Sequence, residues 1–413
     1  MCCLAKPDLK DSNGNTLSFE KQTIEEIWNS PRIIEARRKM LAGERVAECF
    51  ECYNEEKLGP HSMRIGFNQK WFEQEKDAIY ERVEESKKDN YKLSSMPWYY
   101  DIRQGNLCNL KCRSCFPENS VAIEKEYEAI KSQDPWFEKN FRSPVITESY
   151  RRWYKNPNFT EQFLAQLPNI KKLYFTGGEP TLIESNYDLL QKCIDLNLAG
   201  NIELMFNTNT TRISDRFIDL LSHFRYVLLN LSIDGFGREQ EYLRAGSDWT
   251  TIKANLEKLA AAKKSNVEMV LNPVFQACNA VSITKLFYFV EDLNSTYGDR
   301  CFYIMPIILN GSKHLVTDIL PKSVRKLASE RLMEYLKKSK LAKNGDLFTK
   351  RIHQMIELLN SENDPDPEAV ARFIRFTKTL DARRNQDFRE YFPELYRLWT
   401  EADNSFNWNT PGL

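Results

Sequence analysis

Three cysteines stand close together in the sequence, in the run Cys108-Asn-Leu-Lys-Cys112-Arg-Ser-Cys115. Three thiolates with this spacing can hold three irons of a cubane [4Fe–4S] cluster, so the fourth iron has no protein ligand. A catalytic zinc site keeps one coordination position open in the same way, and that position receives the reactant. The run therefore predicts a cluster that binds a small molecule. Zinc accepts the same thiolates, so a zinc site is the alternative.

Polar or glycine-containing motifs follow the next three strand-like apolar runs. Glycine lets a ligand approach the backbone closely, and the fork of an arginine suits recognition of a carboxylate. Each motif alone is typical of a turn, but a purely structural metal site needs none of them at successive strand ends. The motifs are Gly177-Gly178-Glu179-Pro180, Asn207-Thr208-Asn209-Thr210-Thr211, and Ser232-Ile233-Asp234-Gly235 with Arg244 after it.

Short apolar runs alternate with helical patterns between about residues 97 and 320. This alternation predicts βαβ units and a parallel sheet, and motifs at successive strand ends favour a barrel. We therefore expect an α/β fold, a partial (β/α)6 TIM-like barrel. The expected strands are 98–102, 172–176, 202–207, 227–233, 267–275 and 302–308, and the expected helices between them include 187–196, 215–224, 249–262 and 283–293.

The rest of the chain is predicted to be mainly helical. Residues 1–66 form a small cysteine-bearing module with an amphipathic helix over 24–41, and residues 67–96 form a charged helical linker. The barrel spans 97–320 and contains a long insertion, 116–170, rich in aromatic residues such as Trp136, Phe141 and Trp153. Only helical patterns remain in a C-terminal extension, 321–413.

Composition and charge exclude several classes of protein. The chain has 413 residues, 42% of them hydrophobic and 28% charged, which is ordinary for a globular protein of two or three domains. Basic and acidic residues both number 58, so no generalised nucleic-acid or membrane-surface binding is expected. No apolar run is long enough to cross a bilayer, and the first residues do not resemble a signal peptide. We expect a cytoplasmic protein.

The cysteine run and its companion motifs resemble the radical S-adenosylmethionine (SAM) superfamily. The resemblance implies that Cys108, Cys112 and Cys115 bind a [4Fe–4S] cluster and are the catalytic residues. Relatives often have an aromatic residue just before the third cysteine, where it packs near the adenine of SAM. This chain has Ser114 there and Phe116 directly after the third cysteine, so the resemblance does not decide whether Phe116 packs on the adenine. The implied SAM-binding residues are Gly177, Gly178, Glu179, Pro180, Thr208, Asn209, Ser232, Asp234, Arg244 and Phe116.

A second group of cysteines lies near the N-terminus. Cys2-Cys3 and Cys49-Phe-Glu-Cys52, with the segments between them, resemble the auxiliary-cluster module called twitch, a relative of the SPASM domain. The module usually follows the barrel, and here it precedes it. The resemblance implies a second iron–sulfur cluster on Cys49, Cys52 and one or both of Cys2 and Cys3, with a zinc site, lipidation of the pair and unmodified surface cysteines as alternatives. Cys193, Cys278 and Cys301 are expected to be buried, and the four histidines show no ligand spacing.

The resemblance also implies the reaction. Reductive cleavage of SAM at the cluster yields a 5′-deoxyadenosyl radical, which abstracts hydrogen from a substrate, an oxidoreductase or transferase chemistry. Relatives with auxiliary clusters often modify peptides or proteins, so a peptide or protein is the expected substrate; a nucleotide, sugar or other small metabolite is the alternative. A low-potential donor such as flavodoxin or ferredoxin is the expected partner. A non-catalytic iron–sulfur or zinc scaffold is the alternative of another class.

Overall fold

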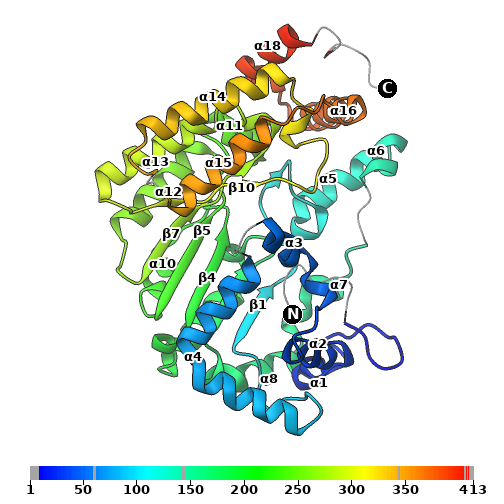
Figure 1. The fold of residues 1–413 in the computed structure, drawn as a ribbon, viewed down its shortest axis with the longest axis vertical. Helices are drawn as coiled ribbons and strands as arrows, with labels where there is room; N and C mark the ends of the chain where they lie inside the picture. The colour runs from blue at the N-terminus through cyan, green and yellow to red at the C-terminus, as the bar shows by residue number, and fades with distance from the viewer. Residues whose placement is uncertain are drawn as a thin grey trace. The chain divides into compact units, whose positions relative to one another are not determined.

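The computed structural model describes residues 9–58, 62–141, 145–342, 345–403, 406 and 408. The chain divides into two compact parts, one made of residues 1–100 with 152–171 and the other of residues 101–151 with 172–413 (Figure 1). The long insertion is thus shared between the two parts, because its second half packs with the N-terminal residues. The predicted division into a module, a linker, a barrel and an extension stays a prediction.

The first part is built from helices. One helix over 24–41 was expected, and this is wrong: the chain forms two helices with Asn29 and Ser30 between them. The break arises because Pro31 begins the second helix, and a residue before proline is pushed into an extended conformation, as Ser30 is here. The helices are α1 (Ile24–Trp28), α2 (Pro31–Leu41), α3 (Phe50–Leu58), α4 (Met63–Lys88) and α8 (Pro157–Gln166), with 3-10 turns at Ala47–Cys49, Trp153–Lys155 and Leu167–Asn169.

Residues 152–171 contact several residues of the N-terminal segment, among them Trp98. The backbone N–H of Lys171 donates to the carbonyl of Trp98 at 2.9 Å, and the ammonium of Lys171 lies 4.8 Å from the Trp98 ring centroid. The ring of Phe163 packs edge-on against Tyr100 at 5.1 Å, and Trp153 stacks on Phe19 at 5.5 Å. These aromatic contacts are why the second half of the insertion belongs to this part.

The second part contains a six-stranded sheet in the order β1-β3-β4-β5-β7-β9, open between β1 and β9. Neighbouring pairs from β3 to β9 run parallel, so the α/β class and the partial barrel are confirmed (Figure 1). Two expected strands, 267–275 and 302–308, are each split in two; Asn272 and Pro273 interrupt the first, because proline cannot donate to a strand ladder. The six strands are β1 (Tyr99–Arg103), β3 (Lys172–Thr176), β4 (Glu203–Thr208), β5 (Tyr226–Leu231), β7 (Val267–Leu271) and β9 (Tyr303–Ile304).

The two faces of this sheet differ in chemistry. Phe175 and Phe206 are buried on one face, where Phe217 of α10 packs edge-on against Phe206 at 5.3 Å. The opposite face carries polar groups, because side chains alternate along a strand. On that face the Asn207 amide donates to the Tyr174 hydroxyl at 2.6 Å, and the Asn230 amide donates to Asn207 at 2.9 Å. Helices therefore cover the apolar face of the sheet.

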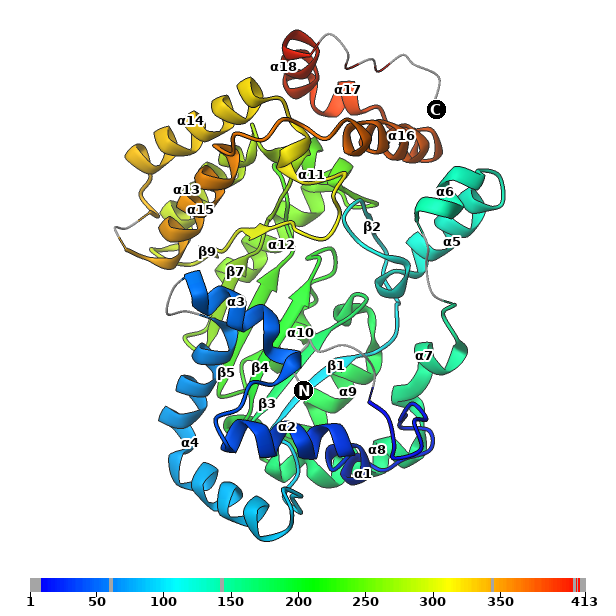
Figure 2. The same ribbon diagram turned by 45° about the vertical axis from the view of Figure 1, so that its right-hand side comes forward.

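The remaining elements of the second part flank the sheet (Figure 2). Short strands form two small two-stranded sheets, β8 with β10 and β2 with β6. No helix of the described residues is both long and apolar enough to span a membrane. The elements are β2 (Lys111–Cys112), β6 (Arg244–Ala245), β8 (Val274–Phe275), β10 (Ile307–Ile308), α5 (Val121–Lys131), α6 (Pro135–Asn140), α7 (Glu148–Arg152, at the boundary), α9 (Glu184–Asp195), α10 (Asp215–Leu221), α11 (Arg238–Leu243), α12 (Trp249–Ala261), α13 (Ile283–Tyr297), α14 (Lys322–Lys338), α15 (Leu347–Leu359), α16 (Pro367–Arg384), α17 (Phe388–Tyr391) and α18 (Pro393–Ala402), with 3-10 turns at Pro117–Asn119, Pro180–Leu182, Ala199–Asn201, Ala277–Asn279 and Thr317–Ile319.

Candidate functional site

The cysteine loop follows β1 and is fixed by pairing with a distant strand. β2 runs antiparallel to β6, so Cys112 lies opposite Arg244 in the register. The backbone N–H of Arg113 extends this pairing by donating to the carbonyl of Leu243 at 2.9 Å. The loop that carries the three cysteines is therefore held against the loop after β5, which carries the Asp-Gly motif and its arginine.

The three thiols are half-buried, and N–H groups point at two of them. Cys108 Sγ accepts from the backbone N–H of Leu110 at 3.5 Å and from the side-chain amide of Asn209 at 3.9 Å. Cys112 Sγ accepts from Arg244 Nη1 at 3.7 Å. Hydrogen bonds to sulfur tune iron–sulfur clusters, so this donor set fits three cluster-binding thiolates.

Burial keeps these thiols protonated when no metal is bound. It raises the pKa of Cys108 to about 11 and the pKa of Cys115 to about 12. Burial also raises the pKa of Cys112, while the positive charges of Arg244 and Arg384 act in the opposite direction. Metal ligands must be deprotonated, so binding of a metal at these thiols would release protons.

The Gly-Gly motif after β3 packs on the backbone just before the first cysteine. Gly177 has a φ of +107°, a conformation that side chains rarely adopt. A Cβ on Gly178 would lie 2.2 Å from the carbonyl oxygen of Leu107. The backbone N–H of Glu179 donates to that same oxygen at 2.7 Å. Only glycine at 178 allows this approach, and the approach sets the position of Cys108.

Glu179 is 1% exposed, and its carboxylate faces donors of the protein. Oε1 accepts from the Thr181 N–H at 3.1 Å, the Thr181 hydroxyl at 2.7 Å and the Thr208 hydroxyl at 2.8 Å, and Oε2 accepts from the Asn209 N–H at 2.6 Å. Burial raises the pKa of Glu179, and these four donors oppose the rise. Its visible role is to join the ends of β3 and β4, so Glu179 and Thr208 orient the site from within.

The side chain of Asn209, like that of Glu179, forms hydrogen bonds with neighbouring loop residues. Its amide donates to Asn109 Oδ1 at 2.9 Å, and its Oδ1 accepts from the Thr211 hydroxyl at 2.7 Å. Thr210, the next residue, is fully buried with a φ of +64°. A β-branched residue in this left-handed region is strained.

An ion pair at the end of β5 holds the arginine beside the cluster loop. Arg244 Nη2 donates to Asp234 Oδ1 at 3.0 Å, and Arg244 Nε lies 2.8 Å from Asp234 Oδ2. Asp234 is fully buried and also accepts from the Val274 N–H at 2.9 Å. The guanidinium is therefore aimed by Asp234, with Nη1 facing Cys112.

The remaining expected SAM-binding residues differ in exposure. Phe116 is 52% exposed directly after Cys115, Ser232 is half-buried at the end of β5, and Pro180 is buried in the turn after the Gly-Gly motif. Phe116 and Ser232 thus lie at accessible positions, in contrast to Glu179, Thr208 and Asp234.

The auxiliary cysteines belong to the first part of the chain. Cys2 and Cys3 lie outside the described residues. Cys49 ends a 3-10 turn and Cys52 lies in α3, where it is 5% exposed. No cysteine among the described residues forms a disulfide.

The other three cysteines are buried, as expected: Cys193, Cys278 and Cys301 are at most 3% exposed. No three His, Cys, Asp or Glu side chains of the described ranges converge on a single metal ion. A cubane does not require such convergence, because each thiolate binds its own iron.

Sequence reasoning missed the residues that brace the cysteine loop. The Asn106 amide donates to Glu124 at 2.9 Å, and Glu124 pairs with Arg151 at 2.6 Å. Arg113, inside the cysteine run, pairs with Asp381 of α16. Arg113 stands in the motif itself, but its partner is far along the chain and only the fold brings it near.

The comparisons with known proteins agree with the cysteine motif. Residues 102–276 match the family model of the radical SAM superfamily. Over this segment the chain is similar to the radical SAM superfamily. The matched segment runs from β1 to just beyond β8, so it contains the three cysteines and all the strand-end motifs.

Two curated relatives come from Methanocaldococcus jannaschii, and both are uncharacterised proteins. One is 24% identical over 169 residues, covering 40% of this chain and 35% of the relative. The other is 25% identical over 138 residues, covering 32% of this chain and 37% of the relative. The matches thus span about a third of each relative's length.

Two solved structures show a weak overall likeness. Native anSMEcpe with bound AdoMet has a TM-score of 0.39 at 18% identity, covering 59% of this chain and 61% of that chain. Streptococcus suis SuiB bound to the precursor peptide SuiA has a TM-score of 0.39 at 17% identity, covering 65% of this chain and 52% of that chain.

Proposed function

We propose that this protein is a radical SAM enzyme that cleaves SAM reductively and uses the resulting radical to abstract hydrogen from a substrate. The observation that carries the proposal is the set of three thiols on one loop, Cys108, Cys112 and Cys115, with N–H donors aimed at two of the sulfurs. When bound, the cluster and SAM supply the 5′-deoxyadenosyl radical. The protein binds and orients the reactants and excludes water.

The residues of the strand ends have separate tasks in this proposal. The backbone at Gly177 and Gly178 packs closely on the chain over residues 103–107, so its task is to position the backbone that leads into Cys108. Arg244, aimed by Asp234, carries a positive charge beside Cys112 that favours the carboxylate of SAM. Phe116 is exposed and can stack on the adenine. Ser232, the residue directly after β5, adds a hydroxyl at this strand end.

The second cluster remains part of the proposal. Cys49, Cys52 and one or both of Cys2 and Cys3 would hold it, as the resemblance to the twitch module implies. Support from the described residues is limited to the short spacing of Cys49 and Cys52 on adjacent turns. About eight irons per chain implies two clusters, whereas about four irons together with zinc implies a zinc site instead.

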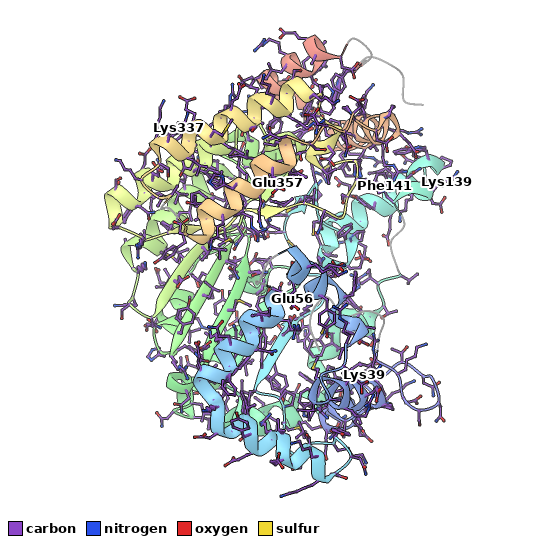
Figure 3. All side chains as sticks on the ribbon, in the orientation of Figure 1. Lys39, Glu56, Lys139, Phe141, Lys337 and Glu357 are labelled. Carbon is purple, nitrogen blue, oxygen red and sulfur yellow. The ribbon has the colours of Figure 1, made fainter. Side chains whose placement is uncertain are left out.

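A peptide or protein is the substrate class we propose, on the resemblance of the N-terminal module alone. The aromatic insertion does not add support, because several of its rings pack against other rings of the protein. Phe141, labelled in Figure 3, contacts Phe137 at 4.6 Å, Phe376 at 4.9 Å and His314 at 5.3 Å. A nucleotide, a sugar or another small metabolite is the second candidate for the same chemistry.

The deciding experiment measures 5′-deoxyadenosine. The protein is reconstituted with iron and sulfide without oxygen, reduced with dithionite, incubated with SAM and analysed by chromatography. We expect product from the wild type and none from Cys112→Ala, while Cys193→Ala, which removes a buried thiol of α9 remote from the cluster motif in sequence, retains it. A fully loaded wild type that neither binds nor cleaves SAM would support the scaffold alternative.

A further inference from the structure

Helix α16 lies beyond the matched segment 102–276, yet side chains of its last turn pair with residues of the cysteine loop. Arg113, between the second and third cluster cysteines, pairs through Nη2 with Asp381 and donates to Gln386 Oε1 at 3.2 Å. Arg113 Nε donates to the carbonyl of Tyr242 at 3.2 Å, and its guanidinium lies 3.6 Å from the centre of the Tyr242 ring. The Arg113 side chain is only 1% exposed, so this charge depends on its carboxylate partner.

Asp381 is held in turn by two further donors. The Tyr242 hydroxyl donates to Oδ2 at 3.2 Å, and the backbone N–H of Phe388 donates to the same oxygen at 2.8 Å. The carboxylate is thus fixed by α11, by α16 and by the start of α17. A rigid acceptor of this kind sets the position of the arginine that it binds.

A second link joins the same turn of α16 to the residue before Cys112. Lys111 Nζ lies 2.9 Å from Glu126 Oε1, and Arg384 donates to Glu126 through Nε at 3.1 Å and Nη2 at 2.6 Å. The side chains of Glu126 and Arg384 are 7% and 2% exposed. One carboxylate of α5 is therefore shared by a cysteine-loop lysine and an α16 arginine.

These links bring positive charge close to the thiols. Arg384 shares the Glu126 carboxylate with Lys111, the residue directly before Cys112. Among the described residues, Arg113 Nη1 and Arg384 Nη1 are buried without a hydrogen-bond partner. Net charge and N–H donors near a cluster set its reduction potential, because reduction adds one negative charge that nearby cations stabilise.

We propose that Asp381 and Arg384 of α16 are positioning residues of the cluster site, which hold the cysteine loop and set the charge that the cluster meets. This rests on the proposed function, since it requires a cluster at the three cysteines. It makes α16, which the family model does not cover, an integral part of the redox centre.

The test compares two adjacent arginines of one helix. Arg384→Gln removes the positive charge that shares Glu126 with Lys111, and Arg383→Gln is the matched control. Arg383 is exposed and donates to the Ala129 carbonyl at 2.9 Å and to Gln133 at 2.8 Å, so it contacts the end of α5 rather than the cysteine loop. Reconstituted full-length proteins are titrated against dithionite with EPR detection, and iron release to a chelator is timed.

We expect Arg384→Gln to lower the midpoint potential and speed iron release several-fold, with Arg383→Gln close to wild type. Asp381→Asn removes a negative charge, so we expect it to raise the potential, and Arg384→Lys to retain most of the wild-type potential. Opposite shifts from Arg384→Gln and Asp381→Asn cannot come from general damage to the fold. If Arg384→Gln does not fold, Asp381→Asn still tests the direction of the shift in midpoint potential, with Arg384→Lys as the variant that keeps the charge.

Equal potentials and release rates in Arg384→Gln and Arg383→Gln, or a fall in potential in Asp381→Asn, would overturn the inference. A wild type that assembles no cluster would instead refute the proposed function. The two failures are therefore distinguishable in one set of measurements.

Discussion

A single added methyl group at Gly178 tests how the Gly-Gly motif and the cysteine loop are joined. In Gly178→Ala the new Cβ would lie 2.2 Å from the Leu107 carbonyl oxygen, 2.7 Å from its carbon and 2.9 Å from its nitrogen. Real Cβ atoms essentially never approach another heavy atom within 3.0 Å. All three contacts are with backbone, so no side chain can rotate away, and the chain next to Cys108 must move.

The size of the effect follows from this geometry. Overpacking of this kind costs about 1–3 kcal/mol. Moving the Leu107 carbonyl also weakens its hydrogen bond from the Glu179 N–H, worth about 1 kcal/mol. We therefore expect Gly178→Ala to lose about 2–4 kcal/mol of stability. Because the displaced backbone leads into the first cluster ligand, iron content and SAM cleavage should fall as well.

The measurement is urea unfolding of the apo-protein, followed by iron analysis and 5′-deoxyadenosine formation after reconstitution. Gly200→Ala is the control, because nothing lies within 4 Å of its Cβ position and its φ is not positive. We expect Gly200→Ala to stay within about 0.5 kcal/mol of wild type. Wild-type stability and iron content in Gly178→Ala would refute the argument that this glycine sets the position of Cys108.

Three further predictions concern buried groups. Thr210→Gly should raise the free energy of unfolding in urea by about 1 kcal/mol, because it relieves left-handed strain and removes a buried hydroxyl without a partner. The flexibility of glycine in the unfolded chain offsets part of this gain. A lower free energy of unfolding would contradict the prediction. Burial lowers the pKa of His314 to about 4, helped by the charge of Arg372. Since the unfolded pKa is about 6.5, this histidine's contribution to stability is present above pH 6.5 and is lost as the pH falls towards 4. Between pH 7.5 and 5.5 the wild type should therefore lose about 1 kcal/mol more stability than His314→Phe, and parallel pH profiles of the two proteins would exclude this role. Glu179→Gln places an amide N–H among hydrogen-bond donors, so we expect the variant to lose about 2 kcal/mol of stability and to cleave little SAM. A variant that unfolds at the same urea concentration as the wild type would show that the carboxylate is dispensable.

Local patterns predicted the sheet well. The strand 172–176 has its expected bounds, and the strands near 98–102, 202–207 and 227–233 moved by one or two residues. Alternation of side chains along a strand is a local property, which explains the success. The prediction of a single helix over 24–41 is wrong because of a local feature, Pro31, which starts a new helix.

The roles of individual site residues were harder to predict. Glu179, Thr208 and Asp234 were expected to bind SAM, and the structure shows them buried and bonded to other parts of the protein. A motif identifies which residues stand at a strand end but does not show which direction each side chain takes. Their assignment as SAM-binding residues stays a prediction, and their visible role is to orient neighbouring groups.

The sequence by itself predicted the chemistry of the cysteine motif, because the spacing of three thiols on one loop is a local fact. It also determined the order of strands and helices, because periodicity needs only neighbouring residues. Tertiary structure alone decided that Asp381 meets Arg113 and that residues 152–171 join the N-terminal helices. Such contacts depend on how distant segments bury their charges and rings together, and nothing within either segment specifies the partner.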